Sequence, residues 1–335
     1  MEGTGLAFRA DSAADASPRE GLTRNKAERE EFAAAVLAGL ARAPRSIPCR
    51  FFYDAYGCAL FEQITQLPEY YPTRTETALL EKHGEEIARL TGHNRVLVEF
   101  GSGSSRKTST LIEAFGPVPM PAYIPIDVSA ESLQEAARWL SLKHWDLRIE
   151  PVVGDFTKPV QLPAFVRTWP KLGFFSGSTI GNFTHDEARE FLRNAARLLG
   201  KGSRFLIGVD LKKPDIILVP AYDDARGVTA AFNLNLLARI NRELEGDFEL
   251  ARFAHEAIWN AEAGRIEIYI KSLADQRVRV LGREFRFARG ERIHTENSHK
   301  YSVPEFQALA SAAGWTAVKA WTDPDQLFSL HLLRS

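Results

Sequence analysis

Between Val96 and Asp210 the chain alternates short apolar segments with amphipathic ones, and this alternation restricts the fold more than any other feature. The apolar segments have the length of strands, and the segments between them carry apolar residues at helical spacing. Because parallel strands need helical crossovers and are buried on both faces, this order predicts an α/β fold with a doubly wound, mostly parallel sheet. The predicted strands are 96–100, 123–127, 149–153, 172–175 and 204–210, and the predicted helices between them are 108–115, 130–142 and 186–199.

The pattern changes after Lys212. A helix is predicted over 229–244, and residues 253–293 then alternate polar and apolar side chains between glycine turns, which is typical of an antiparallel meander. A helix over 303–313 and strands over 317–321 and 328–333 are predicted to rejoin the first sheet. Further helices are predicted before the alternation, over 25–43 and 75–90.

Composition argues against several classes of function. The 42 Lys and Arg residues balance the 43 Asp and Glu residues to a net charge of −1, whereas a nucleic-acid binder needs clustered cations in excess. No apolar run reaches the roughly 18 residues that a membrane helix needs, and residues 1–20 carry no secretory signal. Cys49 and Cys58 are too few for a disulfide framework, and His294 and His299 lack a metal-ligand spacing. We therefore expect a reduced, cytoplasmic enzyme without a metal site.

The clearest chemical motif is the pair Gly101 and Gly103, which ends the first of these strands. Glycines permit a tight turn and close approach of a ligand. Asp127, 24 residues after Gly103, and Asp155 end the next two strands, where they would reach a ribose and an adenine in the same crevice. A dinucleotide site and a P-loop both require glycine where this chain has Arg106. S-adenosylmethionine, which has no phosphates, fits this pattern best; a glycine turn with incidental acids is the alternative.

Two other short segments are candidates for ligand contact. Asn182 precedes the capping box that begins at Thr184, so its amide lies on a loop at the carboxyl edge of the predicted sheet. Glu296 and Ser298 are two residues apart, and in an extended segment they share one face. A carboxylate beside a hydroxyl suits a nitrogen heterocycle. On the residues alone, a contact to the loop backbone for Asn182 and a solvated edge for Glu296 and Ser298 are the favoured interpretations.

Several longer segments resemble the S-adenosylmethionine-dependent histidine Nα-methyltransferases of ergothioneine biosynthesis. The resemblance runs from about Arg50 to the C-terminus. It rests on Tyr53-Asp54, Leu67-Pro68-Glu69-Tyr70-Tyr71-Pro72-Thr73-Arg74, Glu99-Phe100-Gly101-Ser102-Gly103, Gly177-Ser178-Thr179-Ile180-Gly181-Asn182, Ala221-Tyr222-Asp223-Asp224, Phe232-Asn233-Leu234-Asn235 and Trp321-Thr322-Asp323.

The resemblance implies a Rossmann-like class I methyltransferase that transfers three methyl groups from S-adenosylmethionine to the α-amine of L-histidine, giving hercynine. The cofactor contacts that it implies are Gly101, Gly103, Lys107, Asp127, Asp155 and Phe156. The implied contacts to the substrate's amino-acid backbone are Tyr71, Gly177, Asn182 and Tyr222, and those to the imidazole are Glu296 and Ser298. Ile268 replaces a methionine beside the imidazole, and Tyr53 lies near the amine as a catalytic candidate without acting as a strong base.

The resemblance also implies a division of labour along the chain. We expect a mobile leader at 1–20, an α+β substrate-binding domain of 21–75 and 212–299, and a cofactor-binding domain of 76–211 and 300–335. We expect a monomer that binds neither nucleic acid nor membrane. Two alternatives stay open: an Nα-methyltransferase for another aromatic amino acid such as tryptophan, which Ile268 permits and Glu296 disfavours, and a cofactor-binding protein without turnover.

Overall fold

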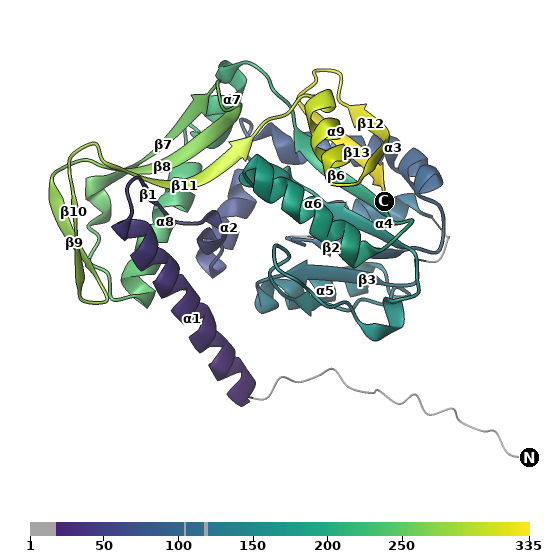
Figure 1. The fold of residues 1–335 in the computed structure, drawn as a ribbon, viewed down its shortest axis with the longest axis horizontal. Coiled ribbons are helices and arrows are strands. Elements are labelled where there is room, and N and C mark those ends of the chain that lie inside the picture. The colour runs from purple at the N-terminus through teal and green to yellow at the C-terminus, as the bar shows by residue number, and fades with distance from the viewer. Residues whose placement is uncertain (1–17, 104, 117–119) are drawn as a thin grey trace, which may run out of the picture.

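The computed structural model describes residues 18–103, 105–116 and 120–335, which form two main sheets connected through one long strand (Figure 1). The predicted leader falls largely outside the described residues, and helix α1 (Pro18–Ala41) begins inside its last three positions. Within the described part, no helix is long and apolar enough to cross a membrane.

The larger sheet has seven strands in the order β12-β13-β6-β5-β2-β3-β4. Every neighbouring pair is parallel except those made by β13, which runs antiparallel to both β6 and β12. The strand order reverses between β2 and β5, which places a crevice at the carboxyl ends of these two strands. The strands are β2 (Val96–Phe100), β3 (Tyr123–Asp127), β4 (Val152–Val153), β5 (Lys171–Phe175), β6 (Arg204–Asp210), β12 (Thr316–Thr322) and β13 (Phe328–Arg334).

Helices cover both faces of this sheet, which explains the unbroken apolar runs of its strands. Val98 faces one core with Phe191 of α6, whereas the adjacent Leu97 faces a second core with Leu80 of α3. One face is covered by α6 (His185–Leu199) and α9 (Val303–Ala312), and the other by α3 (Tyr71–Thr91), α4 (Arg106–Ala114) and α5 (Ala130–Lys143). The predicted doubly wound α/β fold of a class I methyltransferase is thus confirmed.

The second sheet has four strands in the order β1-β11-β8-β7, and a separate hairpin of β9 and β10 extends from it. It packs on α8 and α7 and shares a core with α1. The strands are β1 (Arg45–Ser46), β7 (Phe253–Asn260), β8 (Arg265–Ser272), β9 (Gln276–Val280), β10 (Arg283–Phe287) and β11 (Arg292–His299). The helices are α2 (Ala55–Ile64), α7 (Asp215–Tyr222) and α8 (Val228–Glu243). Short 3₁₀ turns are η1 (Cys49–Phe52), η2 (Ala164–Val166), η3 (Thr179–Asn182) and η4 (Leu250–Arg252).

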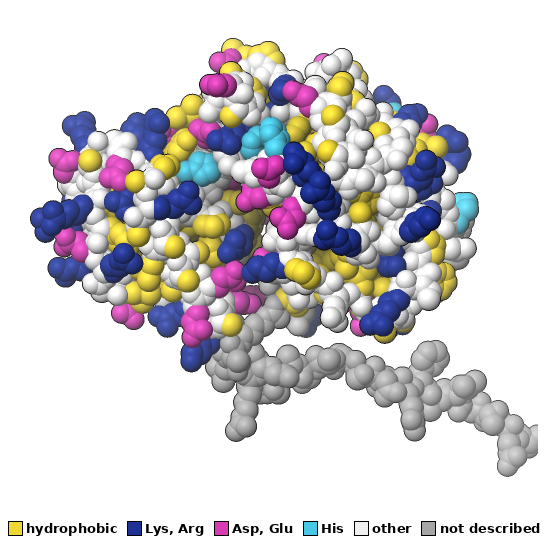
Figure 2. Space-filling view, viewed as in Figure 1, with side chains coloured by type: hydrophobic (Ala, Val, Ile, Leu, Met, Phe, Trp, Pro, Cys, Tyr) yellow, Lys and Arg dark blue, Asp and Glu magenta, His cyan; other side chains and the backbone are white. Residues whose placement is uncertain are grey.

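Strand β11 connects the two sheets, and the hollow between them is visible on the face in Figure 2, with acidic side chains gathered beside it. After β11 the chain continues through Lys300 to α9, and the backbone of Tyr301 donates to Asp210 at the end of β6. Turn η3 lies against β11 at Gly181, where a Cβ atom would come within 2.7 Å of the carbonyl oxygen of His299. Only glycine permits this approach.

The structure differs from the sequence-based expectation in three elements. The predicted strand 149–153 is reduced to Val152–Val153 plus a single bridge from Ile149 to Tyr123. The predicted meander is split, because β9 and β10 leave the sheet as their own hairpin. Helices α2 and α7 were not expected; α7 follows Pro214 and contains Pro220, and such prolines usually mark a boundary.

Candidate active site

The crevice between β2 and β5 is bounded by the glycine turn. Gly101 and Gly103 both have positive φ, 76° and 46°, which side chains tolerate poorly. A Cβ on Gly101 would lie 3.4 Å from the ring of Phe156, so the turn and that ring are in close contact. Phe156 in turn packs edge-on against Phe100 and Phe175. The predicted glycine pair therefore does form a tight turn at the end of β2.

Two carboxylates end the strands beside this turn. Asp127 is the last residue of β3; burial raises the pKa of its carboxyl, although backbone N–H groups that include those of Ser129 and Gly103 oppose the shift. Asp155 follows β4, where burial is outweighed by hydrogen bonds from Thr157 and by Lys158, so the pKa of Asp155 is lowered. Each carboxylate is thus held by local backbone or neighbouring side chains at the same edge of the sheet.

Lys107 connects this crevice to the loop after β5. Its Nζ lies 2.6 Å from Oε2 of Glu76, which is fully buried on α3, and the same oxygen accepts a hydrogen bond of 2.8 Å from the backbone N–H of Gly177. The side chain of Lys107 remains 20% exposed. An ammonium held in this way, between the glycine turn and the β5 loop, can also take up a carboxylate.

These residues fit S-adenosylmethionine. The tight turn at Gly101 lets a ligand approach the backbone, and Asp127 offers acceptor oxygens for ribose hydroxyls. Phe156 offers a flat apolar surface, and Lys107 offers a positive charge for an amino-acid tail. In the described part of the chain, no group of three His, Cys, Asp or Glu side chains is arranged to hold a metal ion.

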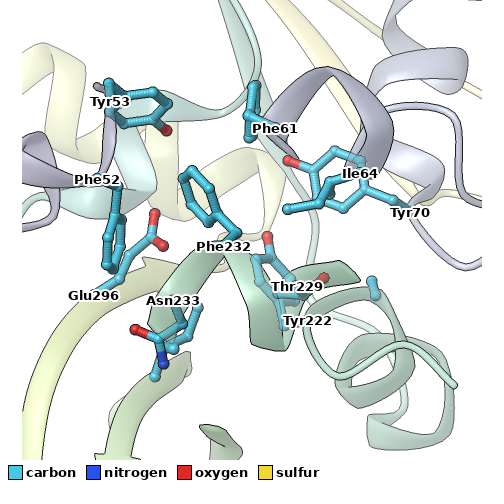
Figure 3. Close-up of a pocket in the computed structure, with 12 residues that line it drawn as sticks. Phe52, Tyr53, Phe61, Ile64, Tyr70, Tyr222, Thr229, Phe232, Asn233 and Glu296 are labelled. Carbon is cyan, nitrogen blue, oxygen red and sulfur yellow. The ribbon is translucent and has the colours of Figure 1, made fainter. Parts of the chain in front are cut away.

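A second cavity lies between α2, α8 and the four-stranded sheet (Figure 3). Its wall is largely aromatic, and the carboxylate of Glu296 points into it between Phe52 and Phe232. Rings of Tyr53, Phe61 and Phe232 pack together with centroids 5.6 to 5.9 Å apart. The lining residues are Phe52, Tyr53, Phe61, Ile64, Tyr70, Ala221, Tyr222, Thr229, Phe232, Asn233, Ile268 and Glu296.

Glu296 is the chemically distinctive group of this cavity. Burial raises the pKa of its carboxyl to about 7, with partial opposition from Lys300 and from the side chain of Asn182. Burial, reinforced by Glu296, also holds the pKa of Tyr53 well above its usual value, so the Tyr53 hydroxyl stays protonated. The cavity therefore combines an apolar wall with one carboxylate that is ready to accept a hydrogen bond.

The extended conformation predicted for Glu296 and Ser298 is confirmed. Both lie on β11, opposite Ile268 and Ile266 of β8, after an irregularity between His294 and Glu296. Oγ of Ser298 lies 2.9 Å from the hydroxyl of Tyr222, a lining residue.

A buried charge cluster that sequence reasoning missed lies directly behind this wall. Lys300 Nζ donates to Asp210 at 2.5 Å, to the Tyr222 hydroxyl at 2.6 Å and to Ser298 Oγ at 2.8 Å. Lys213 Nζ donates to the other oxygen of Asp210 at 2.6 Å, to the Tyr71 hydroxyl at 2.7 Å and to a backbone carbonyl. Burial disfavours the charge of Asp210, but the two lysines prevail and lower its pKa. We call Asp210, Lys213 and Lys300 the charge cluster.

The structure brings the predicted residues together in two groups. Those expected at the cofactor surround the crevice: Gly101, Gly103, Lys107, Asp127, Asp155 and Phe156. Those expected at the substrate line the cavity or border it: Tyr53, Tyr222, Ile268, Glu296, Ser298 and Asn182.

Tyr71 and Gly177 are not among the lining residues; the Tyr71 hydroxyl donates to Asp210, and Gly177 donates to Glu76. Asp210 could have been found, because it ends a predicted strand as Asp127 does.

Comparison with known proteins gives a consistent result. The family described as histidine-specific, S-adenosylmethionine-dependent methyltransferases matches residues 32–335. The histidine N-alpha-methyltransferase of Mycolicibacterium smegmatis is 43% identical over 96% of this chain and 96% of its own length. That of Mycobacterium tuberculosis is 41% identical over 89% of this chain and 92% of its own. Ergothioneine biosynthesis protein 1 of Neurospora crassa is 33% identical over 87% of this chain, which corresponds to 33% of that longer protein.

Proposed function

Since this chain belongs to the histidine-specific, S-adenosylmethionine-dependent methyltransferases and methylates the α-amino group of histidine, we propose how its residues divide that reaction between crevice and cavity. We further propose that the transfer occurs three times, giving hercynine for ergothioneine biosynthesis. The observation that carries the residue assignment is the single carboxylate of Glu296 inside an aromatic-walled cavity, beside a buried hydroxyl.

The crevice is the proposed cofactor site. S-adenosylmethionine, when bound, supplies a methyl group on a sulfonium whose leaving group departs neutral. Asp127 holds the ribose hydroxyls, Asp155 lies on the adenine side, and Phe156 packs against the glycine turn formed by Gly101 and Gly103. Lys107, kept in place by Glu76, takes the carboxylate of the cofactor's amino-acid tail.

The imidazole of the substrate is proposed to lie between Glu296 and Ser298. Glu296 accepts from one ring N–H, and the Ser298 hydroxyl pairs with the other ring nitrogen. A side chain without these nitrogens would leave a buried carboxylate and a hydroxyl unpaired, which is costly. This requirement favours histidine over tryptophan, and Ile268 supplies apolar contact to the ring.

The reacting amine is proposed to lie at the end of the cavity nearest the crevice. Asn182, on η3 after β5, interacts with Glu296, and we assign the contacts to the amino-acid backbone to Asn182, Gly177, Tyr71 and Tyr222. Since the Tyr53 hydroxyl stays protonated, it serves as a hydrogen-bond partner and the proton of the amine leaves to water. Aromatic faces tolerate the growing trimethylammonium through cation–π attraction.

The remaining expectations form part of the same proposal. Residues 21–75 and 212–299 would bind the amino acid, and residues 76–211 and 300–335 would bind the cofactor. We propose a monomer in the cytoplasm, which size-exclusion chromatography with light scattering and cell fractionation would check.

The first test is a panel of amino acids incubated with S-adenosylmethionine and analysed by mass spectrometry. We expect histidine to gain three methyl groups and other amino acids to remain unchanged. In parallel, Glu296→Ala should weaken histidine binding by at least ~10-fold while S-adenosylhomocysteine binding stays within ~2-fold, since an unmet charged hydrogen bond costs more than a neutral one. Glu284→Ala on the distant β10 is the matched control. Methylation of a different amino acid, or equal losses for both ligands, would contradict the assignment.

A further inference from the structure

The charge cluster is unusual because its three charged side chains are removed from water. Asp210 and Lys300 are fully buried, and the side chain of Lys213 is 4% exposed. Charged groups are buried at this depth only when they are paired and fully hydrogen-bonded. Both lysines meet this condition, since each ammonium has three acceptors for its three N–H groups.

The charges of the cluster do not cancel. Within the cluster one carboxylate faces two lysines, an excess of one cationic side chain. Burial lowers the pKa of Lys300, while Asp210 and Glu296 oppose that shift, and Asp323 also favours the charge of Lys213. Lys213 keeps most of its charge at neutral pH, because burial lowers its pKa only to about 8 while Asp210 opposes that shift. An uncompensated buried charge is costly, and an anionic ligand nearby would offset that cost.

The cavity itself has no cation. Of its twelve lining residues, all described, Glu296 is the only one with a charged side chain, and it is an anion. An amino-acid substrate brings a carboxylate, which Glu296 repels. Neither lysine can bind that carboxylate directly, because all their N–H groups already have acceptors. The Tyr222 hydroxyl, however, accepts from Lys300 and lies beside the Ser298 hydroxyl, which can donate to it, so Tyr222 can turn its own proton toward an anion. The Tyr71 hydroxyl accepts from Lys213, but it donates its proton to Asp210.

We propose that the charge cluster is the counter-charge for the α-carboxylate of the substrate, with Lys300 acting through Tyr222. Lys300 is a positioning residue, and the inference rests on the proposed function. It predicts that the cavity prefers an amino acid to an amine with the same ring. Lys213 has the smaller effect, because its hydroxyl partner Tyr71 donates to Asp210 and does not line the cavity.

Calorimetry with histidine and histamine, which differ by the carboxylate, tests the proposal in the presence of S-adenosylhomocysteine. We expect the wild-type protein to bind histidine more tightly than histamine. Lys300→Met should weaken histidine binding by at least ~10-fold, because a charge-assisted hydrogen bond to the carboxylate is stronger than a neutral one. Lys213→Met should weaken histidine binding by less. Each variant should change the affinity for histamine by no more than ~2-fold. Each variant leaves Asp210 with one lysine partner, and binding of S-adenosylhomocysteine reports that it is folded.

Three controls separate the outcomes. Lys171→Met removes a different buried ammonium, which donates only to backbone carbonyls, and it should leave the affinities for histidine and histamine unchanged. Ile268→Ala should weaken the binding of both ligands alike, since both carry the ring that Ile268 is proposed to contact. Should Lys300→Met fail to fold, Tyr222→Phe removes the hydroxyl alone and should still weaken histidine more than histamine. Equal losses for the two ligands, or a wild-type protein that binds them equally, would overturn this inference while histidine methylation stands. A wild-type protein that neither binds nor methylates histidine would overturn both.

Discussion

Two carboxylates only a few side chains apart, one fully buried and one partly exposed in a cavity wall, behave in opposite ways. Asp210, in the charge cluster behind the cavity, faces two ammonium groups, and its pKa falls below the usual value. Glu296, in the cavity wall, forms no ion pair with any described residue, and burial raises its pKa to about 7. The carboxylate paired with two ammonium groups stabilises the fold, whereas the one without an ion pair, which accepts from the side chain of Asn182, is left for a ligand. The three predictions that follow would break or sharpen this contrast.

The largest effect is expected at Asp210. Asp210→Ala leaves two buried ammonium groups without a counter-ion and should lower the free energy of unfolding by about 3–5 kcal/mol. Urea denaturation followed by circular dichroism would measure it. Asp325→Ala, at an exposed position, should change stability by less than about 0.5 kcal/mol. If both variants unfold at the same urea concentration, the cluster does not contribute to stability.

Removal of the charge of Glu296 should raise the free energy of unfolding, whereas removal of the charge of Asp210 should lower it. Its pKa is about 7 in the folded protein against 4.5 ordinarily, so the folded state holds the proton more tightly. The ionised form therefore destabilises the fold, and the penalty grows as pH rises from about 4.5 and is complete above about 7. Glu296→Gln should stabilise the protein by about 1–3 kcal/mol at pH 8 and hardly at all at pH 4.5.

Thermal or urea unfolding of the wild-type protein and of Glu296→Gln, each at pH 4.5 and pH 8, would test this expected gain in stability. The same Glu296→Gln variant should bind histidine poorly at pH 8, so stability and binding move in opposite directions. A loss of stability at pH 8 would show that Glu296 has a partner in the folded protein and would remove the contrast with Asp210.

The smallest effect is expected on the apolar side of the cavity. Ile268→Met exchanges side chains of similar volume and should change histidine affinity by less than about 1.5 kcal/mol, because such swaps repack easily. Ile270→Met, on the same strand but outside the lining, is the control and should leave histidine affinity unchanged. Calorimetry would compare them. A loss at Ile268 as large as that of Glu296→Ala would mean that wall shape, and not the carboxylate, selects the substrate.

Most of the crevice could be predicted from the sequence, because all of its named residues except Lys107 end a strand or follow one within three positions. β2, β3 and β6 have the predicted bounds; Gly101 directly follows β2, Asp127 ends β3, and Asp155 lies two residues after β4. Parallel strands end at one edge of a sheet, so a local pattern was enough to gather these residues. Asp155 is likewise held by Thr157, two positions away, whereas Asp127 accepts both from Ser129 nearby and from Gly103 in the turn after β2.

The cavity was much harder to predict, because its residues come from separate segments. Tyr53 follows η1, Tyr222 ends α7 and Glu296 lies on β11. No periodicity connects them. The spacing of Glu296 and Ser298 suggested only that this pair shares a face, and the family resemblance joined the pair to Tyr53 and Tyr222. Lys213 and Lys300 were not singled out at all, since a lysine in a sequence is normally solvated.

Local periodicity, set by backbone geometry, was therefore sufficient for the order of strands and helices and for the glycine turn with its following acids. Partners such as Asp210 and Lys300, 90 positions apart, are a matter of three-dimensional contact alone. Burial multiplies the strength of a charge and the cost of leaving it unpaired, and neither can be assigned until the fold has decided which groups lose their water.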